Sequence, residues 1–151
     1  MFDYAFCRQS SIYVGIYSGN TGDEDYERCV SSMYAFEAEQ RNHPEGIVAV
    51  LVSDPGIPPV PPSWRKRMAE FNQSVQASPY LLSIVTPSAV IRGILTAINW
   101  LSPPRKGHER VAHETFAQAC DWVDRHRGQP QPRLRELHQA ARAKLPSRRA
   151  G

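Results

Sequence analysis

Two histidines near the end of the chain have a spacing that approaches a metal-binding motif. The segment His108–His113 reads His-Glu-Arg-Val-Ala-His, which is one residue longer than the zinc-protease pattern H-E-x-x-H. That pattern works because histidines four residues apart share one face of a helix. Here the segment follows a proline-rich break and reads as a short strand, in which residues five apart point to opposite faces. We therefore expect no metal site at these histidines.

The other candidates for chemistry have simpler explanations. The acidic cluster Asp23–Asp25 could act as a general base or hold a metal, but acids in a first helical turn favour the positive end of the helix dipole. Glycines at 15, 19 and 22 do not have the G-x-G-x-x-G spacing of a dinucleotide site. The three cysteines are far apart and form no C-x-x-C pair, which favours reduced thiols. We therefore expect neither catalytic residues, nor a cofactor, nor a metal.

The stretch that must organise the fold runs from Gly46 to Trp64. Its first part, Ile47–Val52, is a continuous apolar run bounded by turn residues, which is typical of a strand buried on both faces. A loop with five prolines follows, and a helix begins at about Ser63. Because ligands of open α/β sheets bind beyond the carboxyl ends of the strands, this loop is the first place to look for a site.

The remaining patterns predict an α/β fold. Residues 2–6 and 12–17 alternate in polarity and predict a β-hairpin. The capping-box pair Thr21 and Glu24 opens a helix that should run to about Asn42. A second buried strand at 80–85, a short edge strand at 110–113 and helices over 64–75, 89–101 and 116–127 complete the order. Alternating β/α units behind a hairpin imply a mostly parallel sheet covered by helices.

The helix predicted over residues 89–101 is apolar on nearly every side. A helix that packs on one sheet needs only a stripe of somewhat over 100°. The neighbouring helix at 64–75 could cover part of the excess. Any remainder should face a partner, a second copy of the chain or a ligand, with Leu95 as an outward position. Together with the proline loop, it defines the expected partner-binding residues: Asp54, Ser63, Trp64, Val90, Ile91, Ile94, Leu95, Ile98 and Leu101.

Charged residues are unevenly distributed along the chain. The net charge is +3, but residues 127–151 alone contain seven arginines and lysines against one acid. We expect a domain over residues 1–126, with its core ending at Val123, and a basic, proline-framed tail over 127–151, either disordered or a short amphipathic helix. Arg133, Arg135, Arg142 and Arg148 would let the tail contact nucleic acid or an anionic membrane. With no apolar run of about 20 residues and no signal-peptide pattern, the expected location is cytoplasmic.

Three phrases of the sequence resemble the STAS domain, in particular its small stand-alone branch, which is related to anti-sigma-factor antagonists and often named jointly with Sec14-type lipid-carrier domains. They are Thr21–Tyr26, Gly46–Asp54 and Val111–Val123, within a likeness that covers about residues 2–126. The resemblance implies a STAS-like fold and a phosphorylated serine after the central strand, a position matched here by Ser63. Prolines before Ser63 and Trp64 after it depart from the family's context; a helix N-cap is the alternative role for Ser63.

These observations together predict a non-enzymatic, regulatory domain that binds a protein partner or forms a homodimer. The alternative is a carrier or sensor of a lipid or another hydrophobic small molecule. The family name and the excess apolar surface of residues 89–101 both suggest that alternative.

Overall fold

The computed structural model describes residues 1–146 and has the predicted α/β architecture. Five strands form one sheet in the order β1-β2-β3-β4-β5. The hairpin strand β1 is antiparallel to β2, and all other neighbours are parallel. The strands are β1 (Phe2–Cys7), β2 (Ile12–Tyr17), β3 (Ile47–Ser53), β4 (Tyr80–Val85) and β5 (His108–His113).

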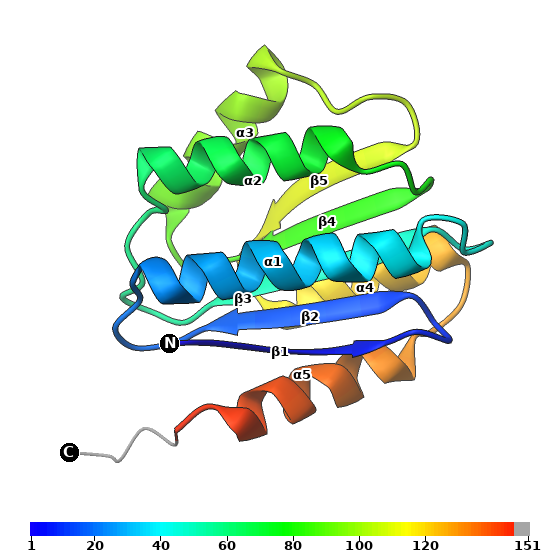
Figure 1. The fold of residues 1–151 in the computed structure, drawn as a ribbon, viewed down its shortest axis with the longest axis horizontal. Helices are drawn as coiled ribbons and strands as arrows, with labels where there is room; N and C mark the ends of the chain where they lie inside the picture. The colour runs from blue at the N-terminus through cyan, green and yellow to red at the C-terminus, as the bar shows by residue number, and fades with distance from the viewer. Residues whose placement is uncertain (147–151) are drawn as a thin grey trace.

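Five helices cover the two faces of this sheet (Figure 1). On one face lie α1 (Asp23–Gln40), α2 (Pro62–Ser74) and α3 (Ala89–Leu101), which connect successive parallel strands. On the other face lie α4 (Phe116–Arg127) and α5 (Pro132–Lys144). None of the helices within residues 1–146 is both long and apolar enough to cross a membrane.

Strand β3 is buried on both faces, as its continuous apolar run predicts. Val48, Val50 and Val52 pack in the core formed with α4 and α5. Ile47, Ala49 and Leu51 pack in the second core, formed with α1 and α2. The turn into β3 requires a glycine, because Gly46 has a φ of 71° and a Cβ there would lie 1.9 Å from the Pro79 carbonyl oxygen.

The start of α1 differs from the predicted capping box of Thr21 with Glu24. The N-cap is Gly22, one residue later, and its backbone N–H donates to the carboxylate of Asp25 at 2.9 Å. The helix also ends slightly early, at Gln40. The acids of the first turn therefore do serve the helix start, through a different pair of residues.

The core does not end at Val123, contrary to the sequence-based expectation. Helix α5 lies against β1 and β2, and Leu134 and Ala141 on its inner face have no exposed surface. Leu137 and Leu145 belong to the same core and are each 8% exposed. The apolar stripe in the basic segment therefore packs on the protein's own sheet.

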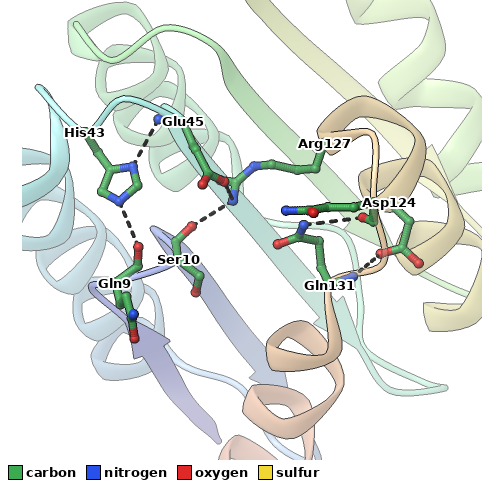
Figure 2. Close-up of polar contacts among 8 residues, drawn as sticks. Gln9, Ser10, His43, Glu45, Asp124, Arg127 and Gln131 are labelled. Carbon is green, nitrogen blue, oxygen red and sulfur yellow. Dashed lines mark hydrogen bonds and ion pairs between the residues drawn. The ribbon is translucent and has the colours of Figure 1, made fainter.

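A buried arginine connects the end of α4 to the amino-terminal ends of β2 and β3 (Figure 2). The side chain of Arg127 is 6% exposed and bonds to the Ser10 carbonyl and to Glu45, each at 2.8 Å. Gln131, which precedes α5, donates its backbone N–H to Asp124 at 2.8 Å. The junction between α4 and α5 is thus fixed by polar contacts as well as by the core.

Candidate functional site

An apolar cavity of about 240 Å³ lies between the sheet and helices α1, α2 and α3. Its floor comes from the carboxyl-terminal parts of β2, β3 and β4 and from β5, through residues such as Leu51, Leu82, Ile84 and Ala112. Met33 of α1 and Met68 of α2 line it on the helical side. A concave, largely apolar hollow with few polar groups is the usual form of a small-molecule site.

Helix α3 borders this cavity beside β5, and its side chains stay partly exposed. None of its residues is buried, although Ile91, Ile94, Leu95 and Ile98 all line the cavity. Polar contacts hold it in place: Ser88 caps its first turn, and Asn99 donates to the Arg110 carbonyl on β5 at 2.7 Å. The apolar side chains under α3 therefore lie over an open volume where a core would normally be.

The proline loop reaches the cavity, as its place after β3 predicts. Residues 57–60 line the cavity at the start of α2. The next turn is anchored by Trp64, which donates to Asp23 of α1 at 2.8 Å and packs against Tyr26 with ring centroids 5.8 Å apart. Because prolines restrict the backbone and Trp64 ties α2 to α1, this wall of the cavity is well fixed.

Among residues 1–146, the charged side chains that line the cavity are those of Arg65 on α2 and Arg110 on β5, with no aspartate, glutamate or histidine. The Arg110 guanidinium donates from Nη2 to the Ser102 carbonyl at 2.9 Å, while its buried Nε has no hydrogen-bond partner. The hydroxyl of Tyr17, which lines the cavity from β2, is buried next to the Cys29 thiol. The polar groups of the cavity are thus few and incompletely satisfied.

A thiol lies in the cavity wall but is poorly suited to nucleophilic chemistry. Burial raises the pKa of Cys29 to about 12, so this thiol stays protonated near neutral pH. Its Sγ lies 3.9 Å from Met33 Sδ. Cys29 therefore acts as an apolar wall residue.

The histidines of β5 lie on opposite faces, as their spacing predicts. His108 packs edge-on against Tyr80, whereas His113 contacts Trp122 of α4 and hydrogen-bonds Ser83 at 2.7 Å. Ser83 has no exposed surface, so this serine–histidine pair cannot meet a substrate. Within residues 1–146 no group of three or more His, Cys, Asp or Glu side chains could hold a metal ion.

The predicted partner-binding residues at the proline loop, Asp54, Ser63 and Trp64, have different contacts. Asp54 accepts two hydrogen bonds from Arg142 of α5, at 2.7 and 2.8 Å. Ser63 is exposed in the first turn of α2, but the N-cap is Pro61, so Ser63 does not cap the helix. Trp64 joins α2 to α1 as described. None of these three residues lines the cavity, whereas residues 57–60 of the same loop do.

The predicted partner-binding residues of α3 separate into two groups. Ile91, Ile94, Leu95 and Ile98 line the cavity, so Leu95 does not point outward as expected. Val90 and Leu101 are 72% and 87% exposed, and Trp100, which the sequence reasoning did not select, is 82% exposed. In the sequence, no local signal separates Trp100 from the other apolar residues of this helix.

The arginines of the basic segment pair with acids of the protein itself. Arg133 pairs with Glu136 at 2.7 Å, and Arg135 pairs with Asp124 at 3.2 Å. Arg142 holds Asp54, and Arg148 lies outside the described residues. Contact of this segment with nucleic acid or an anionic membrane stays a prediction.

Comparison of the chain with protein-family models, curated proteins and solved structures gives no significant match. The resemblance to STAS domains therefore stays a prediction.

Proposed function

We propose that this protein binds a hydrophobic small molecule in the cavity beneath α3, as a carrier or sensor. One observation carries the proposal: α3 places four apolar side chains over a hollow of about 240 Å³, and none of its residues is buried. The protein itself leaves this apolar surface uncovered. A ligand that removes it from water lowers the free energy of the system.

The volume indicates a small ligand. Binding pockets for drug-sized molecules measure about 300–1,000 Å³, so this cavity lies just below that range. The apolar lining supplies the affinity, and few polar groups are available to orient the ligand. A carrier or sensor of this kind binds its ligand without changing it chemically.

The cavity can be tested with a variant that fills it. Ala112 lies on β5 and lines the cavity floor, so Ala112→Phe directs a ring into the hollow from the rigid sheet. Ala38 is exposed on α1 and does not line the cavity, which makes Ala38→Phe the matched control. Both variants add the same apolar group.

Binding is measured from the fluorescence of the neutral apolar dye N-phenyl-1-naphthylamine. The wild type and Ala38→Phe should bind the dye equally, and Ala112→Phe should bind it at least about tenfold more weakly, a loss of about 1.4 kcal/mol. Thermal unfolding should show that both variants are folded. Equal binding by all three proteins, or no binding by the wild type, would contradict the proposal.

A second candidate is the function that the STAS resemblance implies: a cytoplasmic regulatory domain that docks a protein, here a second copy of the chain. It is supported by the exposed apolar residues at the ends of α3, where Val90, Trp100 and Leu101 are each more than 70% exposed. Such groups often mark interfaces, and two-fold homodimers are the commonest oligomers. Phosphorylation of the exposed Ser63 in the first turn of α2 would be its regulatory step.

Sedimentation of the wild type at tens of micromolar tests this second candidate. A dimer that Leu101→Glu dissociates, while the surface control Ala38→Glu does not, would support it. A wild type that sediments as a monomer at this concentration would remove the homodimer from consideration.

A further inference from the structure

Within residues 1–146, the charged side chains that line the cavity all have one sign. Its charged lining residues are Arg65 and Arg110, and no acidic side chain or histidine lines it. A site of this kind attracts negative charge and opposes a cationic ligand, and the surrounding apolar groups strengthen both effects. The following inference rests on the proposed function and concerns the chemistry of the ligand.

Arg110 is the better placed of the two arginines for binding an anion. Strand alternation directs Arg110 to the cavity side of β5, and its guanidinium reaches the end of α3, where Nη2 donates to the Ser102 carbonyl at 2.9 Å. Its Nε is buried without a hydrogen-bond partner. No carboxylate pairs with it among the ion pairs of residues 1–146.

A buried donor without a partner costs free energy, and so does a cation without an opposite charge. A ligand that brings a carboxylate or phosphate oxygen to Arg110 would relieve both costs. A charge-assisted hydrogen bond of this kind is stronger than a bond between neutral groups. Arg65 is exposed, and its side chain forms no hydrogen bond or ion pair within the described residues, so water can solvate it.

The shape of the cavity indicates an elongated ligand. The cavity reaches from Tyr17 on β2 to Arg110 on β5. These strands are three spacings apart in the sheet, which is roughly 14 Å. The volume of about 240 Å³ is that of about eight water-sized groups at roughly 30 Å³ each, and a methylene group is similar in size.

We propose that the ligand is a single-chain amphiphile with an anionic head, and that Arg110 binds the head while the chain lies under α3. The head is a carboxylate or a phosphate monoester, since both supply the oxygen acceptors that Arg110 lacks. The chain has about eight carbons inside the cavity. Ile91, Ile94, Leu95 and Ile98 cover it from α3.

The test compares ligands of equal chain length by calorimetry: octanoate, octyl phosphate and the neutral octanol, all below their aggregation concentrations. The wild type should bind at least one of the two anions about tenfold or more tightly than octanol, because hydrogen bonds to charged groups are the strong ones. The preferred anion identifies the source of the head group. Equal affinity for octanol and both anions would overturn the proposal.

Three variants show which arginine causes the preference for an anion. Arg110→Gln should bring the affinity for the preferred anion close to that for octanol, while octanol binding changes little. Arg125→Gln removes an exposed arginine of α4 on the opposite face and should keep the full preference. Arg65→Gln should keep most of it. If Arg65→Gln abolishes the preference and Arg110→Gln does not, the assignment of the head group is wrong.

Ligands of different carbon-chain length, together with the dye and octanol, distinguish a failure of this inference from a failure of the proposed function on which it rests. Across the series from hexanoate to dodecanoate, affinity should rise about fourfold per methylene and level off once the cavity is full, near eight to ten carbons. If the dye and octanol bind but anions have no advantage, the cavity binds ligands and the head-group inference fails. If none of these molecules binds, the proposed function fails with it.

Discussion

Helix α5 should be essential for stability, although it lies in the segment whose charge suggested an independent tail. Leu134 has no exposed surface and packs in the core that α4 and α5 form with β1, β2 and β3. Replacing a buried leucine with alanine leaves a cavity that the surroundings fill only in part. The change Leu134→Ala therefore tests whether this helix belongs to the cooperative fold.

The expected loss follows from the burial. A buried Leu→Ala change costs about 2–5 kcal/mol, and the full burial of Leu134 places it near the middle, at about 3 kcal/mol. For a chain of this length, each kcal/mol lowers the melting temperature by about 2–4 °C, so the melting temperature should fall by about 6–12 °C. The control Gln139→Ala changes an exposed position of the same helix and should stay within about 0.5 kcal/mol.

Urea unfolding followed by circular dichroism measures both variants. Leu134→Ala should lower the urea concentration at the unfolding midpoint. The m-value, which is the slope of the free energy of unfolding against urea concentration, should stay unchanged, because the same surface is exposed on unfolding. Removing residues 129–151 should be more severe: three buried leucines of this segment contribute roughly 5–9 kcal/mol, against a total stability of about 5–15 kcal/mol. Cooperative unfolding of the truncated chain at the wild-type midpoint would refute this reasoning.

Three further predictions concern other parts of the molecule. Burial, with a smaller effect of Arg142, lowers the pKa of His138, which stacks on Phe116. The unfolded chain then binds the proton more readily, so stability is full above the ordinary pKa of about 6.5 and falls as the pH drops below it; His138→Phe should reduce this fall in urea unfolding between pH 7.5 and 5.5. The first turn of α2 has no acid, so Ser63→Glu should exceed Ser63→Gln in stability by about 0.3–1 kcal/mol, and equal midpoints would argue against the dipole effect. Amide hydrogens of α3 should exchange faster than those of β3 and become protected when the dye binds, because no residue of α3 is buried; equal protection of α3 and β3 in the free protein would contradict this.

Much of the fold could be predicted because its signals are local. The apolar run Ile47–Val52 identifies a strand buried on both faces wherever the rest of the chain lies. Proline and glycine mark the turns, and helical periodicity marks the covered faces. The destination of α5 could not be predicted in this way: the spacing of Leu134, Leu137 and Ala141 defines an apolar stripe but not the surface that covers it.

The cavity could be anticipated only in part. The proline loop was expected near a site because it follows the central strand, and it does line the cavity. Arg110 was not expected there, because its position beneath α3 depends on the pairing of β5 with β4 and on the packing of α3 beside β5. The only local signal was the alternation along residues 108–113, which places His108 and Arg110 on the same face.

Helix α3 has polar contacts near its ends and apolar side chains over the cavity in its middle. An apolar helix would normally be buried on all sides, yet this helix is fixed by polar contacts near its ends, through Ser88, Asn99 and Arg110. Its middle therefore keeps apolar side chains on the cavity side without the burial that would normally stabilise them. A ligand in the cavity would supply that burial, so its binding and the firm docking of α3 would be one and the same event. This coupling would give a sensor its signal, because the exposed Trp100 and Leu101 at the end of α3 would respond to the occupancy of the cavity.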